Sequence, residues 1–353
     1  MSAGPLAGLR VVELASIGPG PFCGMMLADM GADVVRVERP GTGDVWTRSS
    51  VLDRGRQRVV LDLKARAGVD AVLSLVQHAD VLIEGLRPGV AERLGVGPAE
   101  CLARNARLVF GRVTGWGQSG PYSHTAGHDI TYLATTGALH AIGREGERPV
   151  PPVNLLGDFG GGGMLLAFGV LCAVIHARET GRGQIVDAAI VDGAISLTSM
   201  LHGLMASGSW EDVRGVNLFD GGAPFYDTYE CADGRHVAVG ALEAKFFATL
   251  AERLGLTDDP AFTGDHLVRA RWPAIRARLT ETFLTRTRDD WSALLRDSDA
   301  CVAPVLSLRE AAADEANLAR GAFQLVGDEL QPAPAPRFSE APVAAGRTPP
   351  SRV

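Results

Sequence analysis

Cysteines are few in this 353-residue sequence, and their spacing excludes two classes of protein. An odd, scattered set with no CxxC pair argues against a disulfide-stapled secreted domain and against a cysteine-based zinc site. It predicts free thiols in a reducing compartment, and we therefore expect a cytoplasmic protein. The five are Cys23, Cys101, Cys172, Cys231 and Cys301.

Long basic runs and long apolar runs are also missing. The net charge is −7, which disfavours nucleic acid as a partner. The longest apolar run, Met164 to Ile175, is shorter than the roughly 20 residues that a membrane span needs, and the first ten residues lack the pattern of a signal peptide. We expect neither nucleic acid nor a membrane as a partner. A small anionic ligand stays open, because a few local arginines can outweigh the global charge.

Metal-binding motifs are lacking as well. His124 and His128 have the i, i+4 spacing of some metal ligands, but Gly127 lies between them and no HExxH or further ligand set follows. We therefore expect no metal site.

What the sequence has is an alternation of strand and helix patterns over its first 120 residues. Short β-branched runs, such as residues 9–15, 32–40 and 58–63, are separated by helical patterns. This alternation predicts βαβ units, a parallel sheet and therefore an α/β, Rossmann-like domain. Ligands of such sheets bind outside the carboxyl ends of the strands.

The length of the chain predicts more than one domain. A hairpin pattern around Ala232-Asp233-Gly234 and a helix beginning at Glu243 indicate a second, α+β domain, and the proline-rich end of the chain is expected to be extended. The expected division is a large domain over 1–186 to which 320–353 return, a linker over 187–221, a small domain over 222–300 and a return linker over 301–319.

The loop from Gly18 to Gly24 resembles the GxGxxG motif of dinucleotide-binding proteins, with one residue too many before the third glycine. Glu38 lies about where a ribose-binding acid would follow. Two prolines, however, remove amide donors that would hold a pyrophosphate. A tight strand-to-helix turn is therefore favoured over NAD binding.

Several cations come from separate segments near the expected strand ends. Any one of them alone is best interpreted as a solvated surface charge, but several gathered together could bind phosphates through bidentate contacts. Val60, Leu61 and Leu63 could flank an adenine ring. The cations are Arg36, Arg39, Arg54, Arg56, Arg58, Lys64, Arg87 and Arg93.

The segment from Gly127 to Gly163 contains the candidate acid/base groups. His128 and Asp129 are adjacent, and Asp158 follows in front of four glycines. Histidine titrates near neutral pH and a carboxylate can be tuned by burial, so His128 and Asp158 could face each other across one reacting carbon. Asp158 alone would be interpreted as a helix cap; the glycines, which let a backbone approach a ligand closely, favour a site.

An ordered set of motifs resembles the 2-methylacyl-CoA racemase branch of the CoA-transferase family III (CaiB/BaiF) superfamily. The motifs include ELASIGPGPF, GADVVRVERP, AGHDITYLA, NLLGDFGGGG, GQIVDAAIVDG and GGAPFYDTYECADGRHVAVGALE, and they extend over nearly the whole chain. The resemblance implies a Rossmann-like large domain, a small domain and an interlocked homodimer with each site between subunits. It implies no separate cofactor, because CoA is part of the acyl-CoA substrate.

The resemblance also implies roles for individual residues. His128 and Asp158 would be the two acid/base groups, Glu243 the partner that orients His128, and Asp129 a neighbour of the thioester. Two departures are Leu86, where an aromatic residue is more usual, and the short C-terminal tail. The implied CoA-binding residues are Arg39, Leu61, Asp62, Leu63, Lys64, Gly85, Arg87, Arg93, Gly127 and Tyr132.

The implied reaction inverts the carbon next to a thioester. Removal of its weakly acidic proton requires a positioned base and a stabilised enolate oxygen, and inversion requires one base on each face. One alternative is a CoA transferase in which Asp158 attacks the acyl-CoA and forms a mixed anhydride. Another is a non-catalytic acyl-CoA-binding protein. The presence of both His128 and Glu243 favours the racemase.

Overall fold

The computed structural model describes residues 4–41 and 51–343. The chain divides into two compact units. The first consists of Met1–Ala138, Pro152–Thr198 and Asp314–Val353, and the second of Leu139–Pro151 and Ser199–Ala313. The last ten residues of the proline-rich tail lie outside the described part.

A six-stranded parallel sheet, with the order β3-β2-β1-β4-β5-β6, forms the centre of the first unit within the described residues. This is the order of doubly wound nucleotide-binding folds, in which the chain reverses its direction across the sheet between β1 and β4. The predicted α/β class and parallel sheet are confirmed. The strands are β1 (Arg10–Leu14), β2 (Asp33–Glu38), β3 (Arg56–Val60), β4 (Val81–Glu84), β5 (Val109–Thr114) and β6 (Gln184–Ala189).

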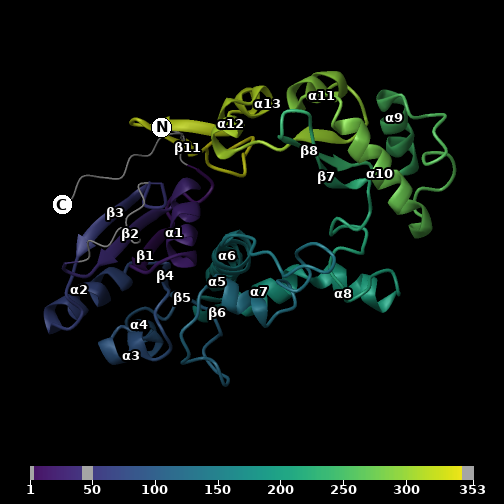
Figure 1. Ribbon diagram of the computed structural model, residues 1–353. Helices are drawn as coiled ribbons and strands as arrows, with labels where there is room; N and C mark the ends of the chain where they lie inside the picture. Colours follow the sequence, from purple (N-terminus) through teal and green to yellow (C-terminus); the bar gives the residue numbers. More distant parts are fainter. Residues whose placement is uncertain (1–3, 42–50, 344–353) are drawn as a thin grey trace. The chain divides into compact units, whose positions relative to one another are not determined.

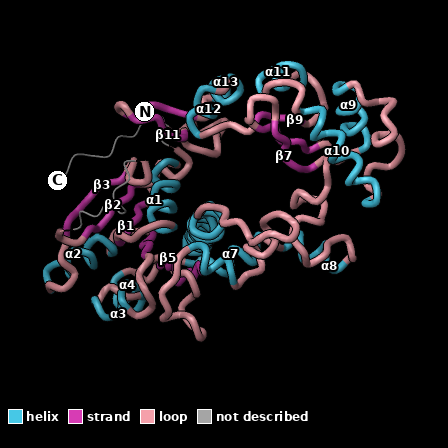
Figure 2. Tube along the Cα trace, viewed as in Figure 1, coloured by secondary structure: helices cyan, strands magenta, loops and turns pink. Residues whose placement is uncertain are grey.

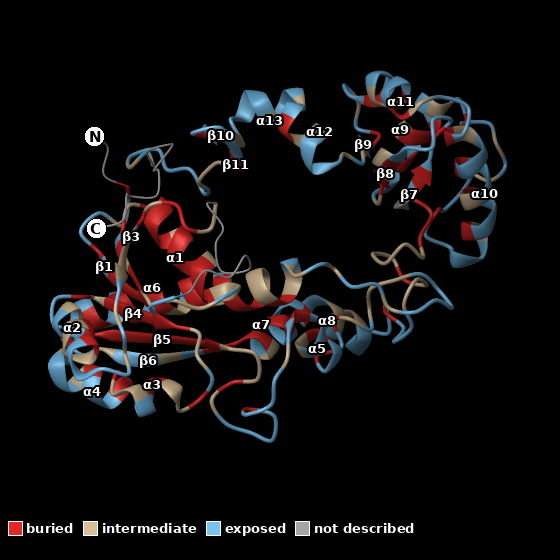
Figure 3. Cartoon of the chain, turned by 60° about the vertical axis from the view of Figure 1, so that its left-hand side comes forward, coloured by how far each residue is buried: buried red, intermediate tan, exposed pale blue. Residues whose placement is uncertain are grey.

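Helices cover both faces of this sheet (Figures 1 and 2). Alternate residues of a strand face opposite sides. Val11 therefore packs with α1 (Pro19–Asp29) and α6 (Leu165–Thr180), whereas Val12 packs with α2 (Arg66–Val76) and α4 (Pro98–Arg104). Figure 3 shows the buried strands between these layers.

The remaining elements of the first unit surround the sheet or end the chain. A ten-residue π-helix, η2, leads directly into α6. The β10–β11 hairpin belongs to this unit, and the buried guanidinium of Arg54 anchors it by donating to Pro332 O. These elements are α3 (Val90–Leu94), α5 (Asp129–Ala134), η2 (Leu155–Met164), α7 (Ile190–Leu197), α13 (Glu315–Arg320), β10 (Phe323–Val326) and β11 (Glu329–Pro332).

The second unit has a three-stranded antiparallel sheet, ordered β7-β8-β9, among its described residues. Its core is aromatic, with Phe225, Phe247, Phe283 and Trp291 buried between the sheet and the helices. The predicted hairpin and the predicted helix after Glu243 are present. The elements are α8 (Ser199–Ala206), β7 (Tyr226–Glu230), β8 (His236–Gly240), α9 (Ala244–Leu254), η3 (Arg269–Arg271), α10 (Trp272–Phe283), α11 (Arg288–Leu295), β9 (Val302–Pro304) and α12 (Leu308–Ala313).

Some expected boundaries differ from the observed ones. β3 begins at Arg56 rather than residue 58, because Arg56 faces the buried interior and pairs with Glu13. The segment 187–221, expected as a linker, contains the end of β6 together with α7 and α8. Residues 187–198 group with the first unit, because α7 packs against η2, and residues 199–221 group with the second.

The helix that follows Asn154 is longer than the apolar run in the sequence. The stretch Leu155–Thr180 is long and apolar enough to cross a membrane by length and composition, and 44 % of its most apolar window is buried inside the protein. Core helices of soluble proteins meet the same criterion. The expectation of no membrane partner therefore stays a prediction.

Candidate active site

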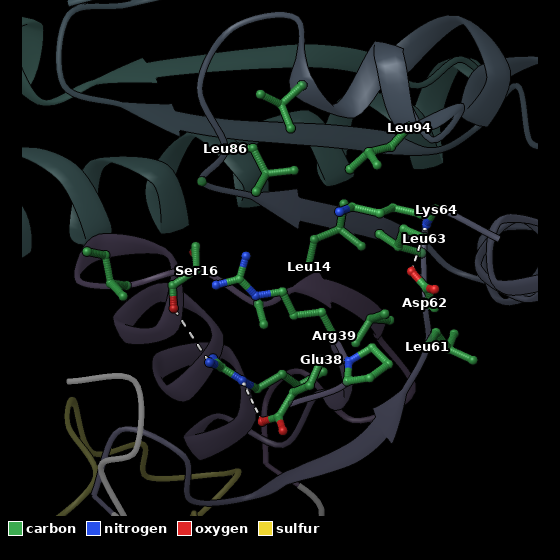
Figure 4. Close-up of a pocket in the computed structure, with 17 residues that line it drawn as sticks. Leu14, Ser16, Glu38, Arg39, Leu61, Asp62, Leu63, Lys64, Leu86 and Leu94 are labelled. Carbon is green, nitrogen blue, oxygen red and sulfur yellow. Dashed lines mark hydrogen bonds and ion pairs between the residues drawn. The ribbon is translucent and has the colours of Figure 1, made fainter. Parts of the chain in front are cut away.

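A cavity of about 660 Å³ opens at the carboxyl ends of β1, β2, β3 and β4 (Figure 4). It spans the place where the strand order reverses, which is where open α/β sheets bind their ligands. Two exposed cations, Arg39 and Lys64, lie at its rim, and its walls are largely aliphatic. Six residues predicted from the sequence line it, namely Arg39, Leu61, Asp62, Leu63, Lys64 and Gly85.

Leu86 also lines this cavity, at the position where the resemblance led us to expect an aromatic ring. Its side chain is partly buried against the apolar layer under the cavity. Leucine supplies apolar contact but no ring on which a base could stack.

Four of the arginines that could have bound phosphates form ion pairs with buried carboxylates instead. Arg36 and Arg56 share Glu13, with Arg36 Nη1 2.5 Å from Glu13 Oε1. Arg58 pairs with Asp53, and Arg54 pairs with Asp29 at 2.6 Å. A buried guanidinium whose charge is matched in this way holds the fold and has little capacity for a phosphate. Phosphate binding is therefore left to Arg39, Lys64, Arg87 and Arg93.

A second cavity, of about 130 Å³, adjoins the first through Gly85 and Leu86. Arg87, Gly127 and Tyr132, all predicted from the sequence, line it together with Trp116. Arg93 lines neither cavity and lies exposed on α3.

Gly127 makes room for an aromatic ring in this second cavity. A Cβ there would lie 2.5 Å from the ring of Tyr132, whose hydroxyl donates to Gly127 O at 2.6 Å. The ring also contacts Trp116 edge-on, at 4.9 Å between centroids. The glycine therefore fixes Tyr132 beside the segment that carries His128.

The start of α5 presents His128 and Asp129 in different environments. His128 is the exposed residue that precedes the helix, and its backbone N–H donates to Thr131 Oγ1 at 2.9 Å. Asp129 is only 6 % exposed, and its Oδ1 accepts the backbone N–H of Asp158 at 2.7 Å. The carboxylate of Asp129 thus ties α5 to η2, and with them the two candidate acid/base residues.

Asp158 lies inside the π-helix η2 and not at a helix cap. π-Helical turns are rare and frequently occur at functional sites. The side chain is half-buried, it accepts a long hydrogen bond of 3.4 Å from Asn154 Nδ2, and a Cβ at Gly18 would lie 3.3 Å from its Oδ2. The loop after β1, whose Ser16 and Ile17 line the first cavity, therefore also borders Asp158.

The glycines after Asp158 serve helix packing. A Cβ at Gly161 would lie 2.9 Å from Ala194 N of α7, and one at Gly163 would lie 2.8 Å from the ring of Phe22 of α1. The three glycines 161–163 are buried between α1 and α7, where only a bare backbone fits. Their packing holds the π-helix, and with it Asp158, in place.

Burial and neighbouring charges act on these carboxylates. Burial raises the pKa of Asp158 above its ordinary value; the hydrogen bond from Asn154 lowers it, the charge of Asp129 raises it, and a protonated His128 lowers it. Burial likewise raises the pKa of Asp129, against the hydrogen bonds from the backbone amides of Asp158 and Gly157. His128 and Asp158 are therefore close enough to influence each other electrostatically.

The phenol of Tyr132 belongs to the same group of charges. Burial raises its pKa, the charge of Asp158 raises it further and that of Arg87 lowers it. Tyr132, which lines the second cavity, is therefore close enough to Asp158 for the charge of one to affect the pKa of the other.

Glu243 lies in the second unit, exposed at the residue that precedes α9. The predicted pairing of Glu243 with His128 stays a prediction. So does the role of Asp129 at the thioester, because the contact of its carboxylate is with the amide of Asp158.

Part of the first cavity was not predicted from the sequence. Ser16 and Ile17 line it after the end of β1, as do Val90 and Leu94 from α3, and Glu38, noted in the sequence for its position after the glycine-rich loop, lines it at the end of β2. The position of Ser16 and Ile17 at a strand end was the available signal. The contribution of α3 depends on how the chain turns back after β4, which no local pattern predicts.

No group of three or more His, Cys, Asp or Glu side chains arranged to hold a metal ion occurs among residues 4–41 and 51–343. The expectation of no metal site stays a prediction.

Comparison with known proteins identifies the family. The sequence model of CoA-transferase family III matches residues 6–352, and the chain belongs to this family. It is 45 % identical to alpha-methylacyl-CoA racemase of Mus musculus over 338 residues, and 43 % identical to that of Homo sapiens; each alignment covers 96 % of this chain and 87 % of the relative. A crystal structure of a CAIB/BAIF family protein from Brucella suis is 27 % identical, with a TM-score of 0.84, and covers 99 % of this chain and 97 % of that one. The resemblance noted in the sequence motifs is confirmed.

Proposed function

We propose that the protein is an isomerase that interconverts the R and S forms of 2-methylacyl-CoA thioesters at the α-carbon. The mouse and human relatives, both alpha-methylacyl-CoA racemases, support this substrate class. The observation that carries the proposal is the hydrogen bond from the Asp158 amide to Asp129 Oδ1, which holds the segments of His128 and Asp158 together.

The proposed reaction is a two-base proton transfer. One of His128 and Asp158 removes the α-proton, the negative charge moves onto the thioester oxygen as an enolate, and the conjugate acid of the other returns a proton to the opposite face. The raised pKa of Asp158 suits this cycle, because its carboxyl must hold a proton in one direction and release it in the other.

The enolate oxygen needs a hydrogen-bond donor. The amide of Asp129 is the first of α5, and first-turn amides have no acceptor within their own helix. We propose that this amide stabilises the enolate while the side chain of Asp129 holds η2. Glu243 is proposed to accept from the imidazole of His128 and to stabilise its charged form.

The first cavity is proposed to bind the nucleotide part of CoA. Its aliphatic walls suit adenine, and the exposed cations Arg39 and Lys64 suit phosphates. Arg87 and the second cavity would hold the arm that leads toward His128 and Asp158. CoA belongs to the substrate here, and we propose no further cofactor.

Hydrogen exchange tests the proposal. The protein is incubated in deuterium oxide with a 2-methylacyl-CoA thioester and no acceptor acid, and deuterium at the α-carbon is measured by mass spectrometry. We expect exchange that accompanies loss of optical purity from either enantiomer. No exchange together with acyl transfer to an added free acid would overturn the racemase. It would favour a CoA transferase in which Asp158 forms a mixed anhydride, an activity that the family name also accommodates.

We also propose that the protein is a homodimer. The last residue of η2, Met164, and two residues of α6, Phe168 and Ile175, are 52 %, 68 % and 60 % exposed, and these apolar side chains suit cover by a second copy. Light scattering after gel filtration should give twice the mass of the chain. A monomer that binds lipid vesicles would favour the membrane instead.

A cytoplasmic location is proposed on the cysteines, all five of which are free thiols in the structure. Cell fractionation with an antibody against the protein tests it.

A further inference from the structure

One carboxylate at the edge of the first cavity has no part in the proposed reaction. Glu38 is the last residue of β2 and lines the cavity (Figure 4). Its side chain is 21 % exposed, and its Oε1 lies 3.3 Å from Arg36 Nε and 3.7 Å from Arg58 Nε. Within the described residues, Oε2 has no hydrogen-bond partner. One oxygen is thus held in place while the other remains available as an acceptor.

The position of Glu38 in the fold suggests what it accepts from. In doubly wound sheets with this strand order, an acidic residue about 20 residues beyond the glycine-rich turn after β1 hydrogen-bonds a ribose hydroxyl of the nucleotide. Glu38 lies 20 residues after Gly18 (38 − 18), at the end of the strand next to β1. The prolines that disfavour a dinucleotide in the β1–α1 loop do not affect this place, which lies on β2.

The charges around Glu38 suit a ribose that carries one phosphate. Arg36 is 2 % exposed and is shared between Glu13 and Glu38, so it orients the carboxylate and is not available to a ligand. Arg39, the next residue, is exposed and lines the same cavity. A carboxylate accepts a hydrogen bond from a hydroxyl group but repels a phosphate, whereas a guanidinium attracts a phosphate.

We propose that Glu38 accepts a hydrogen bond from the free 2′-hydroxyl of the adenosine ribose of CoA. It thereby selects nucleotides that carry their phosphate on the 3′ oxygen and rejects those that carry it on the 2′ oxygen. The inference rests on the proposed function, in which this cavity binds CoA, and it adds a specificity-determining residue to that site.

Calorimetric titration of the full-length protein with two ligands tests this role. The ligands are CoA and its isomer with the phosphate on the 2′ oxygen. The wild type is expected to bind CoA at least about tenfold more tightly than the isomer, as a lost charged hydrogen bond implies. Glu38→Gln removes the repulsion and should lower this ratio to about threefold or less. Glu100→Gln, which neutralises an exposed carboxylate of α4 that lines neither cavity, should leave the ratio unchanged.

The outcomes separate the inference from the proposed function. If the wild type binds neither ligand, the cavity is not a CoA site and both fall. If the wild type and Glu38→Gln bind CoA with the same preference over the isomer, the ribose role falls alone. Thermal unfolding checks that each variant is folded. Should Glu38→Gln unfold, Glu38→Asp keeps the negative charge and should still bind CoA more tightly than the isomer; a preference lost in folded Glu38→Asp would overturn the inference.

Discussion

Two groups of buried carboxylates lie in the first unit, and the protein balances their charges in opposite ways. Under β1, β2 and β3, Glu13 and Asp53 are surrounded by Arg36, Arg56 and Arg58. Around η2, Asp129 and Asp158 form no ion pair with any side chain in the described part of the chain. Asp129 Oδ1 accepts from the backbone amide of Asp158, and Asp158 Oδ2 accepts a long hydrogen bond from Asn154 Nδ2.

The difference distinguishes carboxylates that stabilise the fold from a carboxylate that can exchange a proton during a reaction. Burial raises the pKa of Asp53 and of Asp158 alike, but three arginines oppose it at Asp53, whereas at Asp158 the opposition comes from the amide of Asn154 and from His128. Fixed positive charges favour the ionised form of a carboxylate. A group that must gain and lose a proton in each cycle functions better without them.

The largest expected effect comes from replacing either candidate acid/base residue near η2 by a side chain that cannot exchange a proton. Asp158→Asn and His128→Gln should each lower kcat by about a thousandfold, because a positioned acid or base contributes on this order. Chiral chromatography of the product acyl-CoA measures the rate, and binding of CoA should persist. Asp192→Asn on the exposed side of α7 is the matched control. If Asp158→Asn still racemises at the wild-type rate, Asp158 is no acid/base residue and the comparison fails.

The second effect concerns the paired group and is expected in stability. Arg56→Met leaves Glu13 with one arginine in place of two, and we expect a loss of about 3 kcal/mol in the free energy of unfolding, as for a broken buried ion pair. Urea unfolding followed by circular dichroism measures it. Arg66→Met removes an exposed pair with Asp70 and should cost less than about 1 kcal/mol. Equal losses in the two variants would mean that the buried network is no more important than a surface ion pair.

The third effect concerns the packing of η2, the helix that carries Asp158. Gly161→Ala would place a Cβ against the backbone of α7, and we expect it to cost about 2 kcal/mol through overpacking. At Gly160 a new Cβ would meet Leu155 O of the same π-helix at 3.2 Å and the flexible end of Leu197 at 3.5 Å, so Gly160→Ala should cost less than Gly161→Ala. Thermal unfolding of both variants, with kcat measured at the same temperature, tests this. Gly160→Ala as damaging as Gly161→Ala would show that the packing explanation is wrong.

The smallest expected effect is a pH dependence. Because the folded protein raises the pKa of Asp158, it binds this proton more tightly than the unfolded chain does. The stability contributed by the group is therefore fully present at acid pH, and it is lost as the pH rises from the unfolded value of about 4 through the raised folded value.

Asp158→Asn cannot titrate, and it should gain stability relative to the wild type across this window. The gain should be less than about 1 kcal/mol, because solvent screens a half-buried group. Urea unfolding of both proteins at pH 3.5 and pH 7, about half a unit below and about three units above the unfolded pKa, measures the difference. A gain at pH 3.5 as large as at pH 7 would contradict the raised pKa.

Local pattern determined much of what the sequence alone predicts. The alternation of strand and helix runs and the hairpin around Asp233 are set by neighbours in the chain, and each was visible without a structure. The motifs around His128 and Asp158 likewise identified the family.

Tertiary structure alone decided the role of each charge and glycine. Arg36 and Arg39 are three residues apart, yet Arg36 is buried against Glu13 and Arg39 is exposed at a cavity. The glycines after Asp158 fit the backbones of α1 and α7, which come from residues far from them in the chain. A partner distant in sequence leaves no mark on the local pattern, whereas burial and pairing depend on that partner.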